Sequence, residues 1–483
     1  MASVKTNLVL NGINTVTSLL FPLVTFPYAT RVLMPDGIGL VNFQYSIINY
    51  IILLTSLGIP LYAVKEIARV RDDRSQRDRA AVEIIVMSVM LCLLGYVAVW
   101  AIASFVPQIH RNASLFYVLS AAILFTSIGV EWFYKGIEDF KFITIRAIVV
   151  KTLSAAGLFI FVRTEADIVA YGAILVSTSV GNNLVNFISL RRHISLRGIR
   201  LSDLRIWRHV KGATQVFVLN LIISIYVQLN TVMLGIMAGD DAVGFFVAGT
   251  KIPHIALTLI TSVGVVLLPR CSNLVGQGKM DEFSALITKS LRYTVGLALP
   301  MTVAIMILAR PATMLFCGPE FGESVAVLAL NAPVVLAVSL TNVLGIQLLY
   351  PLGRVRIVVW SVSAGALLNV LLNLALIPAM GAVGASIAAT AAELAVLAVQ
   401  VYMGRRYFPF TRRDIRVGAY LSGTLVMSAV LAAILAFGLR PLWTFIISVT
   451  VAGGAYAAWL VVRRDELASD VLSLIMKSKK TTP

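Results

Sequence analysis

The stretch AVEIIVMSVMLCLLGYVAVWAIASFV, residues 81–106, decides the fold class, because Glu83 is its only charged residue among 26. About 20 apolar residues in a helix are enough to cross the hydrocarbon core of a bilayer. The segment just before it, RDDRSQRDRA at 71–80, is charged at seven of its ten positions. Only helices and closed barrels satisfy their backbone hydrogen bonds in lipid. The pattern therefore predicts a membrane-spanning helix that follows a charged gap.

The same alternation continues along the whole chain of 483 residues, which is 59% hydrophobic and 13% charged, with a mean hydropathy of +0.89. A soluble domain has roughly 45–50% apolar and about 25% charged residues. This excess excludes a soluble enzyme with one anchor, and also an outer-membrane barrel, whose strands alternate apolar and polar residues. We predict an all-α integral membrane protein with about 14 transmembrane helices, at 8–30, 40–62, 81–106, 114–134, 143–162, 167–189, 212–237, 243–268, 292–316, 324–349, 357–377, 381–402, 417–437 and 442–462.

Positive charge is unevenly divided between the gaps. The termini and the even-numbered gaps, with their adjoining helix ends, hold 33 of the 40 Lys and Arg residues, and the odd-numbered gaps hold five. Short loops rich in Lys and Arg stay in the cytoplasm. We therefore expect a multi-pass protein of the cell inner membrane with cytoplasmic N- and C-termini.

A basic connector, RRHISLRGIRLSDLRIWRHVK at 191–211, separates two groups of six predicted spans. We expect an N-lobe at 1–190 (spans 1–6), this cytoplasmic linker at 191–211, a C-lobe at 212–403 (spans 7–12), and spans 13–14 with the tail at 404–483. The motif PDGIGLVNF at 35–43 is echoed by GDDAVGFFVA at 239–248, which favours a parallel repeat. We expect the side chains of the two linker histidines, His193 and His209, to be exposed to solvent. The linker can also be a surface segment attracted to anionic lipid.

Ionisable residues inside apolar runs are the candidate site residues, since a charge at membrane depth costs at least ~2.5–3.5 kcal/mol. Arg31, Lys151 and Lys251 are basic, so a cavity lined by them is cationic and suits an anionic, phosphate-bearing substrate. Amides add contacts for sugars. The candidate substrate-binding residues are Arg31, Lys151, Lys251, Glu131, Asn42 and Asn230.

Each candidate also has a structural interpretation. Arg31 and Lys151 can extend along the lipid to reach the interface. Lys251 can pair with Asp240 or Asp241, and Glu131 can be a partner acid in an aromatic belt. Amides in membrane helices commonly bond other helices.

No pattern for catalysis or a cofactor is found. The four histidines are scattered, the three cysteines lie in or beside apolar runs without CxxC spacing, and the chain has no P-loop. We predict no enzyme activity, no metal and no cofactor. A nucleic-acid partner is excluded as well, because the +17 net charge lies in short gaps rather than on a soluble basic face.

Two segments carry a resemblance to a known family. FPLVTFPYATRVLMPDGIGLVNFQYSIINYIILLTSLGIPLYAVKEIARVRDD at 21–73 resembles the opening of Wzx-type flippases, and EWFYKGIEDFKFITIR at 131–146 resembles the segment after their fourth span. These flippases belong to the multidrug/oligosaccharidyl-lipid/polysaccharide exporter superfamily. The chain departs from the family pattern at Met34–Pro35, where a glycine is expected, and at Asn230, where many relatives carry an acid. The second departure argues against ion coupling at that position.

The resemblance implies two six-helix lobes around a central cavity, plus two C-terminal helices. It implies a flippase that moves undecaprenyl-diphosphate-linked oligosaccharide repeat units, of O-antigen or a related polysaccharide, from the cytoplasmic to the periplasmic leaflet by alternating access. Arg31, Lys151 or Lys251 would then face the diphosphate. Polysaccharide polymerase and chain-length machinery are the implied protein partners, and membrane lipids surround the chain.

Three alternatives remain. A multidrug exporter of the same superfamily should have an acidic cavity, which the sequence does not show. A peptidoglycan-precursor flippase is disfavoured only by the opening motif. A membrane polysaccharide polymerase needs a long periplasmic loop, and the odd-numbered gaps are too short for one.

Overall fold

The computed structural model describes residues 4–195, 200, 202, 204–411 and 414–466, and within these residues every regular element is a helix. It divides into unit 1, Met1–Gly244, and unit 2, Phe245–Pro483. Eleven described helices are long and apolar enough to cross a membrane. The chain is thus an all-helical, multi-pass membrane protein. The predicted lobe boundaries at 190, 211 and 403 and the count of 14 spans stay predictions.

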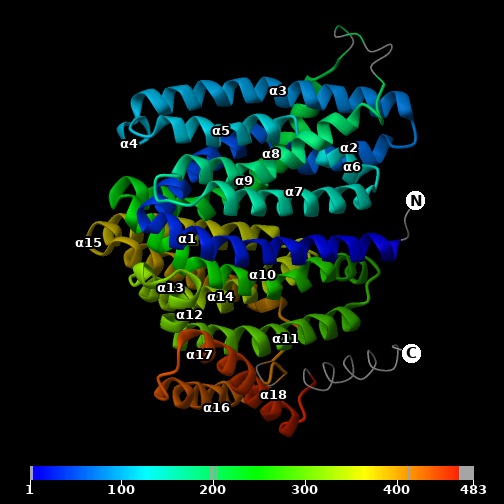
Figure 1. Ribbon diagram of the computed structural model, residues 1–483. Coiled ribbons are helices and arrows are strands. Elements are labelled where there is room, and N and C mark those ends of the chain that lie inside the picture. The colour runs from blue at the N-terminus through cyan, green and yellow to red at the C-terminus, as the bar shows by residue number, and fades with distance from the viewer. Residues whose placement is uncertain (1–3, 196–199, 201, 203, 412–413, 467–483) are drawn as a thin grey trace, which may run out of the picture. The chain divides into compact units, whose positions relative to one another are not determined.

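Unit 1 is built around the first helix. Its helices are α1 (Val4–Ser56), α2 (Ile59–Val70), α3 (Arg74–Phe105), α4 (Pro107–His110), α5 (Ala113–Ser127), α6 (Glu131–Gly136), α7 (Phe140–Phe161), α8 (Ile168–Leu190) and α9 (Trp207–Met237). Helix α1 packs against α3, α5, α7, α8 and α9. Figure 1 shows α3, α5, α7 and α8 running nearly parallel.

Unit 2 contains α10 (Asp240–Gly276, which starts in unit 1), α11 (Met280–Ile307), α12 (Ala309–Phe316), η2 (Pro319–Phe321), α13 (Ser324–Asn331), α14 (Pro333–Thr341), η3 (Asn342–Leu349), α15 (Val355–Gly404), η4 (Arg405–Tyr407), α16 (Val417–Ala436), α17 (Pro441–Ile447), η5 (Ser448–Ala452) and α18 (Gly453–Val462). Helix α11 packs against α14 and α16. The Tyr456 hydroxyl donates to the Gly296 carbonyl at 2.6 Å, which ties α18 to α11.

Two helices are long enough for two crossings each, and both contain a break. Helix α1 is interrupted at Met34 (φ 56°, ψ 178°), between the predicted spans 8–30 and 40–62. Helix α15 is interrupted at Gly381 (φ 50°, ψ −126°), where predicted span 12 begins. A crossing needs about 20 residues, whereas these helices have 53 and 50. The break positions therefore agree with the predicted span edges.

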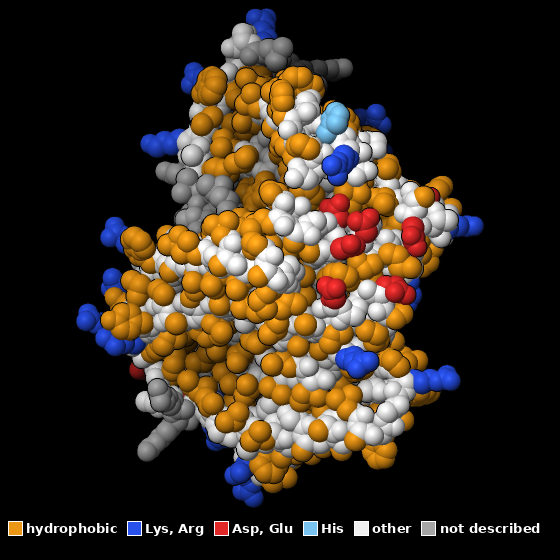
Figure 2. Space-filling model, turned by 90° about the vertical axis from the view of Figure 1, so that its left-hand side faces the viewer, with side chains coloured by type: hydrophobic (Ala, Val, Ile, Leu, Met, Phe, Trp, Pro, Cys, Tyr) orange, Lys and Arg blue, Asp and Glu red, His pale blue; other side chains and the backbone are white. Residues whose placement is uncertain are grey.

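Many large apolar side chains lie on the outside of the helices, in addition to those buried in helix contacts. On α3 these include Met90, Leu93, Leu94, Val97 and Trp100, each between 47% and 66% exposed. Figure 2 shows hydrophobic side chains over most of the visible face. A soluble protein rarely exposes apolar patches of this extent, whereas a membrane protein covers them with lipid.

Candidate functional site

An ion pair with a buried arginine joins two helices of unit 1. The Arg146 guanidinium on α7 is 6% exposed as a residue. It donates from Nη2 to Glu131 Oε2 on α6 at 3.0 Å, and from Nη1 to the Asn186 side-chain oxygen on α8. The Lys135 Nζ lies 2.8 Å from the other Glu131 oxygen, one turn along α6. A buried guanidinium needs such partners to offset its desolvation. Glu131 therefore forms ion pairs with two cations, Arg146 and Lys135.

Lys151 belongs to the same neighbourhood. It lies on α7, half-buried, and its ammonium is close enough to Glu131 for the two charges to interact. Glu131 thus pairs with Arg146 and Lys135 and also interacts electrostatically with Lys151, so that three positive charges meet one negative charge. The Glu131 side chain is 37% exposed, so the group opens to the surface of the unit. A net positive, partly open cluster attracts anions.

Asn186 and Tyr134 hold this cluster in place. The Tyr134 hydroxyl donates to the Asn186 carbonyl at 2.9 Å, and neither residue is exposed. Arg146, Asn186 and Tyr134 were not among the predicted site residues. Arg146 is the last residue of the segment 131–146 quoted above. In the sequence it was interpreted as one of the basic residues near a span end that set the membrane orientation. A buried arginine is recognised only when its partner helices are known.

Two predicted residues of α1 contact their own helix. Arg31 is exposed and donates from Nη1 to the Pro27 carbonyl at 2.7 Å. Asn42 donates from Nδ2 to the Ile38 carbonyl at 2.7 Å, one turn back. Just before Arg31, the Tyr28 hydroxyl donates to the Val162 carbonyl at 2.7 Å, which fixes this part of α1 to the end of α7.

The other two predicted residues lie elsewhere. Asn230 is on α9 and 8% exposed. Lys251 is on α10 within unit 2, half-buried, and its charge reaches Cys317 and His254 of that unit. Of the six predicted residues, the described interactions bring together Glu131 and Lys151.

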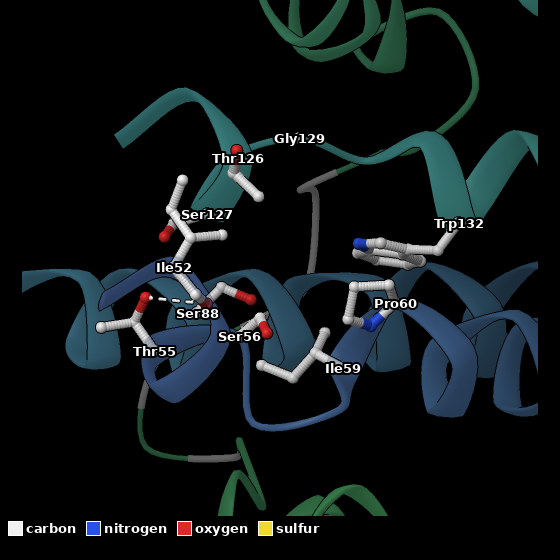
Figure 3. Close-up of a pocket in the computed structure, with 10 residues that line it drawn as sticks. All are labelled: Ile52, Thr55, Ser56, Ile59, Pro60, Ser88, Thr126, Ser127, Gly129 and Trp132. Carbon is white, nitrogen blue, oxygen red and sulfur yellow. Dashed lines mark hydrogen bonds between the residues drawn. The ribbon is translucent and has the colours of Figure 1, made fainter. Parts of the chain in front are cut away.

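A small cavity lies beside the cluster, between α1, α2, α3, α5 and α6. Its volume is about 20 Å³, and its polar lining consists of the hydroxyls of Thr55, Ser56, Ser88, Thr126 and Ser127. Figure 3 shows the Trp132 ring lying over the Pro60 ring at one side of it. A water needs roughly 10–15 Å³ of such volume. The cavity therefore has room for a water but not for a sugar ring.

Unit 2 contains a larger pocket that sequence reasoning missed. It measures about 220 Å³, and Lys289, Tyr293, Asn342 and Gln347 are among its lining residues. The Lys289 ammonium lies over the Tyr293 ring, 5.4 Å from its centre. Asn342 and Gln347 come from the π-helical η3, and π-helical turns are frequent at functional sites. In the sequence, Lys289 was counted among the loop charges that set the membrane orientation. The two amides, Asn342 and Gln347, inside a predicted apolar span were the features that could have indicated this pocket.

One linker residue differs from its predicted environment. His209 was expected to be solvated, but it has no exposed surface. Its Nε2 lies 2.9 Å from Glu83 Oε2 and its Nδ1 lies 2.7 Å from the Tyr62 hydroxyl. Burial lowers the pKa of His209 below its ordinary value, although the hydrogen bond to Glu83 opposes this. The expectation was wrong because the linker packs onto α2 and α3.

These helices, their lipid-facing apolar surface and the cationic cluster define a polytopic α-helical membrane protein. Its fold is shared with transporters of known structure. The inward closed conformation of the lipid II flippase MurJ is similar with a TM-score of 0.76 at 12% identity, over 95% of this chain and 99% of that one. The inward-facing conformation of a multidrug resistance MATE family transporter of the MOP superfamily gives 0.63 at 15% identity, over 84% and 99%.

Residues 4–275, more than half of the chain, match the family described as Polysaccharide biosynthesis protein, and the chain belongs to this family. It is also similar to a "Putative O-antigen transporter" of Escherichia coli (strain K12), 24% identical over 83% of this chain and 97% of the relative. A protein with the same description from Shigella dysenteriae is 24% identical over 78% of this chain and 94% of its own length. The sequence-based assignment to the Wzx-type family is confirmed.

Proposed function

We propose that the chain is a flippase that moves undecaprenyl-diphosphate-linked oligosaccharide repeat units, of O-antigen or a related polysaccharide, by alternating access. The family and the curated relatives support this class of cargo. The observation that carries the proposal within the structure is the excess of positive charge around Glu131. A diphosphate crossing the membrane needs counter-charges, because desolvating it without them is costly.

In this proposal, Lys151, Arg31 and Lys251 are the counter-charges to the diphosphate, and Asn42 and Asn230 contact sugars. Glu131 sets the position of the cationic side chains. The prenyl tail stays in lipid, since moving it into water costs ~0.8 kcal/mol per CH₂. Transport runs from the cytoplasmic to the periplasmic leaflet of the inner membrane, with both termini cytoplasmic, and involves no catalysis. Polymerase and chain-length proteins are the proposed partners.

The test is complementation of a strain that lacks its own flippase, with surface polysaccharide as the readout. The parent chain should restore the polysaccharide. Lys151→Gln should reduce it about tenfold or more, because a charge-assisted hydrogen bond contributes ~1.5–3 kcal/mol, whereas Lys151→Arg should retain most of it. Lys279→Gln is the matched control, since Lys279 is exposed and pairs with Glu282 outside the cluster.

Protein amounts in the membrane fraction must be equal for all variants. No restoration by the parent chain would contradict the proposed cargo. Full export by Lys151→Gln would remove Lys151 from the site. Arg31→Ala should abolish export while the chain still inserts, and cysteines at 151 and 251 should react with a water-soluble thiol reagent.

A further inference from the structure

A second cationic pocket lies at one end of unit 1, where the chain returns from α8 toward α9. Its volume is about 260 Å³, and it is lined by Arg69, Val70, Gln76, Arg79, Arg205 and Arg208. This is far above the roughly 10–15 Å³ that one water requires. None of these residues is among the candidate substrate-binding residues considered above.

The lining carries more positive than negative charge. Arg69 pairs with Glu66 at 2.7 Å, and Arg79 and Arg208 pair with Glu83 at 3.2 and 2.7 Å. Three guanidiniums thus pair with two carboxylates, and the fourth, of Arg205, brings the excess to two positive charges. The Arg205 side chain is exposed, and its link to Glu83 is made by its backbone. Guanidinium groups bind phosphate oxygens through paired N–H donors.

The side chains of Arg69, Arg79 and Arg208 and the backbone of Arg205 are held before any ligand arrives. Glu83 has no exposed surface, and it accepts the Arg205 backbone N–H at 2.7 Å and a hydrogen bond from His209 at 2.9 Å. The Tyr62 hydroxyl holds the other ring nitrogen of His209 at 2.7 Å. Preformed donors lose little conformational entropy on binding, which favours affinity.

With α3 running along the membrane normal, the pocket would lie near the depth of lipid phosphates. Leu94 is near the middle of the exposed apolar surface of α3 and is 66% exposed. Arg79 precedes it by 15 residues, or ~23 Å along a helix at 1.5 Å per residue. Half of a bilayer with its headgroups measures ~20–22 Å. A headgroup phosphate can therefore reach the four arginines.

We propose that this pocket binds the phosphate oxygens of a membrane-embedded headgroup. The inference rests on the proposed function, which makes the diphosphate of the lipid-linked oligosaccharide the intended occupant. An anionic phospholipid offers the same phosphate chemistry. The pocket is then a receiving site at the membrane surface, separate from the cluster around Glu131.

The experiment uses the full chain in phosphatidylcholine vesicles, permeable to the reagents, with Gln76→Cys as a local probe. The native cysteines are all buried. Inorganic pyrophosphate should slow labelling of Cys at 76 by a water-soluble maleimide several-fold. Adding Arg205→Gln should remove this protection. Gln277→Cys, an exposed glutamine in unit 2, should show none.

The source of the phosphate is found by adding phosphatidylglycerol to the vesicles. Slower labelling without pyrophosphate would identify the phospholipid headgroup as the occupant, whereas unchanged labelling would support the diphosphate. The proposal is overturned if neither pyrophosphate nor phosphatidylglycerol slows labelling at position 76. It is also overturned if the protection persists in Arg205→Gln. Arg205→Gln removes no side-chain contact to Glu83, so folding should be kept, as equal melting temperatures would verify.

These outcomes are independent of the export assay. Export without a pyrophosphate effect at residue 76 would end the pocket proposal alone. A pyrophosphate effect without export would end the flippase proposal and leave an anion site.

Discussion

Met34 interrupts α1 with a backbone conformation that glycine adopts at little cost. Its φ of 56° and ψ of 178° fall in a region that is essentially confined to glycine, where another residue costs ~1–3 kcal/mol. The resemblance to Wzx-type flippases placed a glycine at Met34–Pro35, and the structure supplies the physical reason for it. The departure in this chain is therefore a strained residue at the break between two predicted spans.

Met34→Gly should stabilise the protein. Relief of the backbone strain exceeds the ~0.5–1 kcal/mol that glycine loses through its extra freedom in the unfolded chain, so the net gain should be about 1 kcal/mol. The melting temperature in detergent measures it. Val32→Gly, two residues earlier in regular helix, should lower the melting temperature. A fall of the same size in both variants would contradict the strain.

His209 should make the stability depend on pH. Its pKa is lowered by burial, so the unfolded chain binds a proton more readily than the folded one. Stability is then complete above the unfolded pKa of about 6.5 and is lost as the pH falls below it. His209→Gln should flatten the decline of the melting temperature between pH 7 and pH 5. Equal slopes in the parent and the variant would show that His209 does not cause it.

At the scale of the elements, two glycines let helices meet at backbone distance. A Cβ on Gly39 of α1 would run into the Asp240 carbonyl, and a Cβ on Gly244 would run into the Pro35 carbonyl. All four residues belong to unit 1. These residues come from the two echoed motifs, PDGIG at 35–39 and DDAVG at 240–244. Each glycine therefore faces the first residue of the other motif.

Gly39→Ala should destabilise the protein by about 1–3 kcal/mol, the usual cost of overpacking, because backbone atoms cannot move aside as a side chain can. Gly37→Ala is the control on the same helix, where the Cβ would meet the Leu33 side chain at 3.2 Å. Melting temperatures in detergent compare them. An equal or smaller loss for Gly39→Ala would argue against the close crossing.

The sequence was informative about elements whose signal is local. Apolar length, charged gaps and the motif around Met34 indicate helices and their breaks. Contacts across long separations were not predictable. Glu83 reads as a lone charge in an apolar run, because its partner Arg205 lies 122 residues further along the chain. Arg146 and His209 were misjudged or overlooked for the same reason, since burial depends on which helices pack around them.

At the scale of the whole molecule, the charge distribution predicts orientation. Lys and Arg are concentrated at the termini and in the even-numbered gaps, and short basic loops remain on the cytoplasmic side. A reporter inserted after Arg200 should therefore score cytoplasmic, and one inserted after Arg163, in an odd-numbered gap, should score periplasmic. The reverse pattern would invert the topology and place the arginine pocket in the outer leaflet.

The close helix contact at Gly39 and Gly244 also constrains how the sequence can evolve. Gly39 and Gly244 lie 205 positions apart in the sequence, yet backbone atoms of each motif lie directly against the glycine of the other. A bulkier residue at one position pushes the other motif away, and only a compensating change there restores the fit. Natural variants of this protein should therefore inherit the identities of the two positions together, as a linked pair.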